Sequence, residues 1–317
     1  MEILCTARVQ SEIKQRMMEK YPEHHFSFVY GMKEGKEMLP HVEILLTYGE
    51  DLNDDLIEEA KKLKWIMVLS AGMDKMPFEA IAKRDILVTN CRGIHGIPMA
   101  EYAIWKLLDV YKNGKVLMKH QKEEVWDRKV PMQEITGRKM VLAGTGAIAQ
   151  ELARLAKAFR MTTIGVSRSG TSKSSFDQVI TPEKMDEHLG EADFLVSVLP
   201  STKETVHFFK KEHFEKLPQH AVFLNMGRGD VVDERVLMDI LREEKIAHAV
   251  LDVFEQEPLP EGHPFWQMEN VTVTPHLSGI TPQYLPRAFE IFEKNLKHFM
   301  GNDFSALINP IDPKRGY

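Results

Sequence analysis

The stretch Lys139-Met-Val-Leu-Ala143-Gly144-Thr-Gly146-Ala-Ile-Ala149 joins a short apolar run to a tight glycine turn, and helix-forming residues follow it. A strand, a G-x-G-x-x-A turn and a helix in this order are typical of a dinucleotide-binding unit, whereas the turn alone could be a connection that binds nothing. Free N–H groups at the helix N-terminus would hold the phosphates of such a ligand. We therefore expect cofactor contacts from Gly144, Thr145, Gly146, Ala147 and Ile148.

The next apolar run, residues 163–166, ends at Ser167-Arg168-Ser169. An NAD site usually has an acidic residue at this point, where the carboxylate binds the ribose 2′-hydroxyl. A serine followed by an arginine favours a 2′-phosphate instead, because a guanidinium binds phosphate by charge-assisted contacts. The pattern predicts NADP(H) in preference to NAD(H), with Ser167, Arg168 and Ser169 at the cofactor. The alternative is a solvated arginine in a site without preference.

Strand-like and helix-like segments alternate on both sides of the glycine turn. The expected strands are residues 3–6, 26–30, 43–47, 65–69, 86–89, 139–143, 163–166, 194–198, 222–225, 247–251 and 271–274. Such a βαβα order predicts an α/β fold with parallel sheets covered by helices on both faces. A helix-compatible stretch from about residue 98 to 127 separates two such runs, and another covers residues 283–300. We expect the chain to cross between two doubly wound domains near residues 95–100 and 280–287.

Composition limits the kind of protein. The chain has 317 residues, 43% of them hydrophobic and 28% charged, which is the balance of a folded, soluble protein. A net charge of −6 argues against a nucleic-acid partner, and the lack of a long apolar run argues against a membrane span. Cys5 and Cys91 suit reduced thiols in a cytoplasmic protein. We expect no metal site.

Three further segments begin near the ends of predicted strands. They contain Asn225-Met226-Gly-Arg228-Gly, Asp252-Val-Phe-Glu-Gln-Glu257-Pro258 and Pro275-His276-Leu-Ser-Gly279. Ligands of open parallel sheets bind at that edge. Arg228 would hold the carboxylate of a 2-keto acid and polarise its carbonyl, His276 would supply the proton, and Glu257 would orient the imidazole. Each of these residues taken alone could be structural.

These motifs, in this order, resemble the D-isomer-specific 2-hydroxyacid dehydrogenase family. Leu199-Pro200-Ser-Thr-Lys-Glu-Thr205 is similar to the family's LPLTxET segment. Ser70-Ala71-Gly72-Met73-Asp74 resembles its substrate-carboxylate loop, and Pro98-Met-Ala-Glu101 resembles the start of its long helix. The likeness covers nearly the whole chain and is most specific over residues 140–280.

The resemblance implies a substrate domain of residues 1–97 plus 286–317, a cofactor domain of residues 98–285 and an active-site cleft between them. It implies that Arg228, Glu257 and His276 are catalytic and that the backbone of Ala71, Gly72 and Met73 binds the substrate carboxylate. Asp252 would meet the nicotinamide carboxamide. Further cofactor contacts are expected from Pro200, Thr205, Met226 and Gly279. A homodimer with the long helix at its interface is also implied.

The expected activity is reduction of glyoxylate, hydroxypyruvate or a related 2-keto acid to the D-2-hydroxy acid. A phosphoglycerate dehydrogenase is the nearest enzymatic alternative, and a dinucleotide-sensing corepressor on the same fold is a non-catalytic one. A formate dehydrogenase is disfavoured, because Glu257 stands where such an enzyme is expected to have glutamine.

Overall fold

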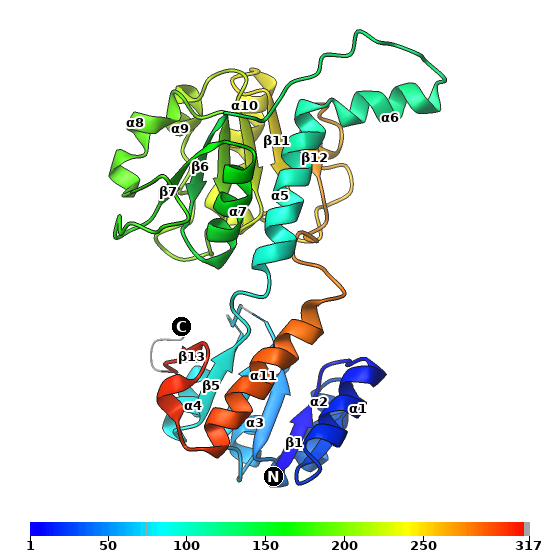
Figure 1. Cartoon of the computed structure of the whole chain (residues 1–317), viewed down its shortest axis with the longest axis vertical. Coiled ribbons are helices and arrows are strands. Elements are labelled where there is room, and N and C mark those ends of the chain that lie inside the picture. Colours follow the sequence, from blue (N-terminus) through cyan, green and yellow to red (C-terminus); the bar gives the residue numbers. More distant parts are fainter. Residues whose placement is uncertain (71, 74, 314–317) are drawn as a thin grey trace. The chain divides into compact units, whose positions relative to one another are not determined.

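The computed structural model describes residues 1–70, 72–73 and 75–313. The chain divides into two units, of which the first joins Met1–Ile94 to Thr281–Tyr317 and the second is His95–Ile280. Each unit has its own largely parallel sheet with helices around it (Figure 1).

Within the described residues, the sheet of the first unit has six strands in the order β13-β5-β4-β3-β1-β2. The strands are β1 (Glu2–Cys5), β2 (His25–Phe28), β3 (Ile44–Thr47), β4 (Trp65–Val68), β5 (Leu87–Asn90) and β13 (Pro310–Ile311). The helices are α1 (Ser11–Lys20), α2 (Met32–Gly35), α3 (Asp54–Glu59), α4 (Phe78–Lys83) and α11 (Tyr284–Met300), with 3-10 turns η1 (Lys36–His41) and η5 (Phe304–Ala306). All pairings are parallel except that of β13 with β5.

Alternating residues of these strands pack on opposite faces of the sheet. Ile3 and Trp65 belong to a core with α1 and α11, whereas Leu4 and Ile66 belong to a core with α3 and α4. Because both faces are covered, the strands are nearly continuous apolar runs. This arrangement confirms the predicted parallel sheet with helices on both sides.

The second unit contains the glycine turn and, within the described residues, a seven-stranded parallel sheet in the order β12-β11-β10-β9-β6-β7-β8. The strands are β6 (Lys139–Ala143), β7 (Thr162–Val166), β8 (Gln178–Ile180), β9 (Phe194–Ser197), β10 (Val222–Asn225), β11 (His248–Leu251) and β12 (Val271–Val273). The helices are α5 (Gly96–Tyr111), α6 (Gly114–Lys122), α7 (Ala147–Ala158), α8 (Asp186–Leu189), α9 (Lys211–Lys216) and α10 (Glu234–Arg242), with 3-10 turns η2 (Pro182–Lys184), η3 (Gly229–Val231) and η4 (Pro264–Trp266).

Two helix layers cover the second sheet. Met140 and Leu142 of β6 pack with α5 and α7, which lie side by side in Figure 1. Val141 and Ala143 face a second core, to which α9 and α10 contribute. The strand order reverses between β6 and β9, which is the topological switch point where doubly wound sheets bind their ligands.

The predicted strands agree with the structure within two residues, and the structure adds β8 and β13. The long helix differs from the prediction, because it ends at Tyr111 and a new helix starts at Gly114. Asn113 between them is left-handed, with φ of 51°, and its side-chain amide donates to the carbonyl of Pro131 at 2.6 Å. Among the described residues, none of the helices has the length and apolar character to cross a bilayer.

Candidate active site

Three adjacent strands place the predicted catalytic loops at one edge of the second sheet. Arg228 follows β10, Asp252 follows β11, and His276 follows β12. Because all three strands run parallel, their carboxyl ends and the loops after them lie together. All the residues that form this edge therefore lie in the second unit.

His276 and Glu257 form a hydrogen-bonded pair. Nδ1 of His276 lies 2.7 Å from Oε2 of Glu257, while the other carboxylate oxygen accepts the backbone N–H of Phe254 at 3.1 Å. The side chain of His276 is 49% exposed, so its second nitrogen remains able to meet a ligand. A carboxylate at Nδ1 fixes both the orientation and the tautomer of an imidazole. The structure thus contains the hydrogen bond between these two residues, and their catalytic roles stay predictions.

Asp252 is fully buried and organises the loop of His276. Its Oδ1 accepts from the Thr274 hydroxyl at 2.6 Å and the Leu277 N–H at 3.0 Å, and its Oδ2 accepts the Ser278 N–H at 2.9 Å. These bonds enclose His276, whose backbone is left-handed with φ of 51°. The structure thus gives Asp252 a positioning role, and its contact with a carboxamide remains a prediction.

Arg228 lies on a loop built by its neighbours. The side-chain amide of Asn225 donates to the Arg228 carbonyl at 2.9 Å and accepts the Gly227 N–H at 3.2 Å. A Cβ on Gly229 would lie 1.9 Å from the carbonyl carbon of Phe254, so the loops after β10 and β11 touch backbone to backbone. This contact requires glycine and places the Arg228 loop against the segment that leads to Glu257.

Two residues of the site were not predicted from the sequence. The hydroxyl of Tyr102 on α5 lies 2.6 Å from that of Thr274, which in turn donates to Asp252. Burial raises the pKa of Tyr102, so its hydroxyl keeps its proton at neutral pH. Tyr102 lacks a local motif, because its partner is distant in the sequence.

The glycine turn fits a dinucleotide. Gly144 has φ of 103°, and a Cβ there would lie 3.0 Å from a methyl carbon of Val198, whereas a Cβ on Gly146 would meet open space. Gly146 also precedes the first turn of α7, where backbone N–H groups lack intrahelical acceptors. Nζ of Lys173 lies 2.5 Å from the Thr145 carbonyl and brings a cation to the turn.

The other residues predicted to contact the cofactor follow strands of the second sheet or begin α7, and they differ in their local contacts. Arg168 is exposed, and the Ser167 hydroxyl is buried without a hydrogen-bond partner in the described structure. The Ser169 hydroxyl accepts the Thr171 N–H at 3.2 Å. The remaining residues have turn or packing contacts: Thr205 donates to the Pro200 carbonyl at 2.6 Å, Met226 is buried against the sheet, and Ala147 and Ile148 open α7.

The predicted substrate loop lies in the first unit. The Ser70 hydroxyl donates to the Gly72 carbonyl at 2.7 Å, and Gly72 is exposed. The Met73 side chain packs in the core of the first unit, so any contact with substrate falls to its backbone. Ala71 lies outside the described residues.

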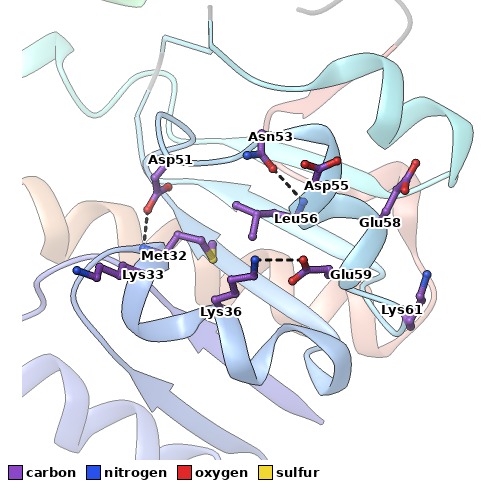
Figure 2. A pocket seen from close by; sticks show the side chains of 10 residues that line it. All are labelled: Met32, Lys33, Lys36, Asp51, Asn53, Asp55, Leu56, Glu58, Glu59 and Lys61. Atoms are coloured by element: carbon purple, nitrogen blue, oxygen red, sulfur yellow. Dashed lines mark hydrogen bonds and ion pairs between the residues drawn. The ribbon is translucent and has the colours of Figure 1, made fainter.

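A separate hollow over α2 and α3 of the first unit is lined by polar and charged side chains, some of which make local contacts. Asp51 accepts the Met32 N–H at 2.8 Å, and Lys36 pairs with Glu59 at 3.2 Å, and dashed lines mark both contacts in Figure 2. Asn53 caps α3 through the Leu56 N–H at 2.9 Å (Figure 2). These contacts stabilise the ends of α2 and α3. The described residues also contain no group of three His, Cys, Asp or Glu side chains suited to a metal ion.

Comparison with known proteins identifies relatives over the full length. Residues 104–278 match the description "D-isomer specific 2-hydroxyacid dehydrogenase, NAD binding domain". A glyoxylate reductase of Korarchaeum cryptofilum is 30% identical over 309 residues, which are 92% of this chain and 91% of that protein. A D-3-phosphoglycerate dehydrogenase of Methanocaldococcus jannaschii is also 30% identical over 83% of this chain, but the match spans only 50% of that protein.

Solved structures agree with this relationship. A D-isomer specific 2-hydroxyacid dehydrogenase family protein of Aeromonas salmonicida is 33% identical, with a TM-score of 0.87 over 98% of this chain and 99% of that one. A D-isomer specific 2-hydroxyacid dehydrogenase of Xanthobacter autotrophicus, solved with NADPH and MES, is 26% identical, with a TM-score of 0.80 over 100% and 99%. With a nicotinamide dinucleotide-binding domain and these relatives, the chain belongs to the D-isomer specific 2-hydroxyacid dehydrogenase family of oxidoreductases.

Proposed function

We propose that this protein reduces a small 2-keto acid, such as glyoxylate or hydroxypyruvate, to its D-2-hydroxy acid with NADPH. The observation that carries the proposal is the His276–Glu257 pair at 2.7 Å, on the same sheet edge as Arg228. Reduction of a ketone requires a hydride at carbon and a proton at oxygen. The reduced nicotinamide supplies the hydride when it is bound, and the chain supplies the remaining groups.

The proton would come from Nε2 of His276, because Nδ1 is bonded to Glu257. Positive charge on the imidazole is offset by the Glu257 carboxylate, which also prevents the ring from turning. Arg228 would bind the substrate carboxylate and stabilise negative charge on the keto oxygen. Loss of such a preorganised donor commonly reduces the rate about 10²–10³-fold. We further propose that the backbone of Gly72 and Met73, in the first unit, binds the substrate carboxylate; Ala71, predicted with them, lies outside the described residues.

The preference for NADPH is supported by the end of β7. Ser167 and Arg168 stand where an acidic residue would select NAD, and Lys173 adds a second cation beside the glycine turn. The structure of the relative from Xanthobacter autotrophicus holds NADPH, which agrees with this preference. We also propose that Gly144, Thr145, Gly146, Ala147 and Ile148 contact the NADPH.

We also propose a homodimer in the cytoplasm. Large apolar side chains are exposed on α5, on α6 and on the segment after it: Ile97, Trp105, Val116, Leu117, Met118, Val125, Trp126 and Met132. Such a patch is typical of an interaction surface. Two free, buried cysteines suit a reducing compartment, and the net charge of −6 speaks against nucleic acid as a partner.

The direct test is oxidation of NADPH or NADH by the purified protein with glyoxylate, hydroxypyruvate and phosphohydroxypyruvate. We expect the highest kcat/KM with NADPH and one of the two unphosphorylated acids. His276→Ala should lower kcat by about 10²–10⁴-fold, and Glu257→Gln should lower it less, while the NADPH Kd stays unchanged.

A preference for phosphohydroxypyruvate would favour a phosphoglycerate dehydrogenase. NADPH binding without turnover of any 2-keto acid would favour the dinucleotide-sensing alternative, and unaltered turnover by His276→Ala would contradict the proposed mechanism.

A further inference from the structure

His95 lies at the start of the second unit, and its side chain is directed toward the catalytic edge. It precedes α5, and its carbonyl accepts the Met99 N–H at 3.1 Å, but its imidazole makes no capping hydrogen bond to the helix. A Cβ built on Gly279 would lie 3.0 Å from Cδ2 of His95. The imidazole therefore packs directly against the backbone of Gly279, on the loop that carries His276.

This contact joins the two places where the chain passes from one unit to the other. His95 is the first residue of the second unit, and Gly279 is next to its last residue, Ile280. On the side of the first unit, the Arg287 guanidinium donates to the Ile94 carbonyl at 3.5 Å, so a residue after the second crossing also contacts one before the first. Gly279 leaves room for the ring, because any larger residue would push against it.

His95 is also close to Arg228. Burial and, to a lesser degree, the positive charge of Arg228 lower the pKa of His95. The imidazole is therefore neutral at neutral pH and adds no positive charge beside the guanidinium. A neutral imidazole has one donor and one acceptor nitrogen, so it can hydrogen-bond to groups of either kind in this region.

The first turn of α5 fixes the backbone of His95. A Cβ on Gly96 would lie 3.5 Å from the Ala147 carbonyl, so α5 begins in contact with the first turn of α7. The backbone of His95 is thus fixed by α5, which touches the start of α7 after the glycine turn. The imidazole of His95 contacts the His276 loop at Gly279 and lies near Arg228.

We propose that His95 is a positioning residue of the active site, where it holds the Gly279 end of the His276 loop in the arrangement that binds the substrate carboxylate. The inference rests on the proposed function and adds a residue to it. It predicts a defect in binding of the keto acid, with little change in binding of the dinucleotide.

The test compares His95→Phe, which keeps a flat ring without nitrogen atoms, with His95→Asn and His95→Gln, which keep polar atoms near Nδ1 and Nε2. Each variant is first compared with the wild type by circular dichroism and Tm. For His95→Phe we expect the KM for the best keto acid to rise by about tenfold or more, with kcat within about threefold and the NADPH Kd within about twofold. At least one of the two amide variants should restore KM to within about threefold.

Gly279→Ala provides a second, independent measurement, because its methyl group would displace the imidazole. We expect the alanine to raise KM in the wild type and to have less than about a twofold effect in a His95→Ala background, which is the coupling expected of residues in contact. Equal effects of Gly279→Ala in the two backgrounds would overturn the proposed contact. A His95→Phe protein with wild-type KM would overturn the part of the proposal that assigns a role to the imidazole nitrogens.

Oxalate separates failure of this inference from failure of the proposed function. As a planar dicarboxylate that cannot be reduced in this reaction, it probes the carboxylate site in the NADPH complex by calorimetry without turnover. If the wild type binds oxalate but reduces no keto acid, only the function fails, and weaker oxalate binding by His95→Phe still supports the role of His95. Unchanged oxalate binding by His95→Phe would overturn that role, and a wild type without turnover or oxalate binding would overturn both proposals.

Discussion

The buried carboxylate of Asp252 shows how single residues build this site. It accepts three hydrogen bonds, and Thr274, one of its donors, is itself within hydrogen-bond distance of Tyr102 on α5. An unpaired buried carboxylate is costly, so these contacts stabilise the ion and, at the same time, fix the His276 loop. The proton donor is therefore oriented by its own partner Glu257 and by the backbone that Asp252 holds.

At the same scale, Arg168→Ala tests the cofactor preference. A guanidinium on a 2′-phosphate makes charge-assisted bonds, whose loss should weaken NADPH binding by about tenfold or more. NADH lacks that phosphate, so its Kd should change less than about twofold. Titration by nucleotide fluorescence measures both constants.

Arg242→Ala is the matched control, since this exposed arginine on α10 pairs with Asp239 at 3.5 Å. Equal losses for NADPH and NADH in the Arg168 variant would contradict the predicted preference.

The sequence predicts candidate site residues where they belong to short motifs, and it offers no signal for residues that make contacts across the fold. Arg228 and His276 were identifiable because each follows a strand in a recognisable segment. Tyr102 lies on α5 and His95 directly before it, and only packing of this helix on the sheet brings them to Thr274 and Gly279. A local pattern cannot encode such a contact, because its two residues lie far apart in the chain.

Among the elements, the loops after β10 and β11 meet backbone to backbone at Gly229. Gly229→Ala would place a methyl group 1.9 Å from the Phe254 carbonyl carbon, so one loop must move. We expect a loss of about 2 kcal/mol or more in the free energy of unfolding. Urea unfolding followed by circular dichroism measures it.

Gly190→Ala is the control within the same unit, because its Cβ would meet only the Lys216 carbonyl at 3.8 Å. It should change stability by less than about 1 kcal/mol. Equal stability of the two variants would show that the loops do not require glycine at position 229.

His248 gives β11 a pH-dependent stability. Its ring lies 2.9 Å from the Thr272 hydroxyl, and burial, with a smaller effect of Lys115, lowers its pKa to about 3. In the unfolded chain a histidine titrates near 6.5. Below that pH the unfolded state binds a proton that the folded state does not, so stability falls as pH drops from about 6.5 toward 3, by up to about 1.4 kcal/mol per unit.

His248→Gln should therefore show a shallower loss of unfolding free energy between pH 6 and pH 4 than the wild type. Urea titrations at four pH values measure the two slopes, with the exposed His41→Gln as a control that should keep the wild-type slope. Parallel curves for His248→Gln and wild type would refute the prediction.

Element boundaries were predictable where a strand is buried on both faces, as in β6 and β10. The short edge strands β8 and β13 were missed, because Gln178-Val-Ile180 and Pro310-Ile311 contain at most two β-branched residues in a row, whereas the edge strand β12 is β-branched throughout. The break at Asn113 was missed for a different reason. Asn113-Gly114 is itself a helix-ending pair, but the helix-forming residues before Asn113 and after Gly114 outweighed it in the prediction. In the structure the left-handed turn is stabilised by a contact with Pro131.

For the molecule as a whole, the exposed apolar residues from Ile97 to Met132 predict its association state. We expect a mass near twice 36.5 kDa by light scattering. Combined Met118→Glu and Trp126→Glu substitutions, at side chains 57% and 91% exposed, should give the monomer mass, because buried charges disfavour an apolar interface.

Tyr30→Glu, at an exposed aromatic residue of the first unit, is the control and should remain dimeric. A monomeric wild type, or a double variant with the wild-type mass, would contradict the expected interface.

The first unit is built from two chain segments that are separated by the second unit, and this has a consequence for synthesis on the ribosome. Its core includes Phe289 and Phe292 of α11, and β13 covers the edge of β5, so segments from both sides of the second unit are needed to complete it. The second unit is a single continuous segment and leaves the exit tunnel before α11 does. A nascent chain would thus fold its second unit first. The strands β1–β5, although synthesised earlier, would keep apolar faces uncovered until α11 has been synthesised.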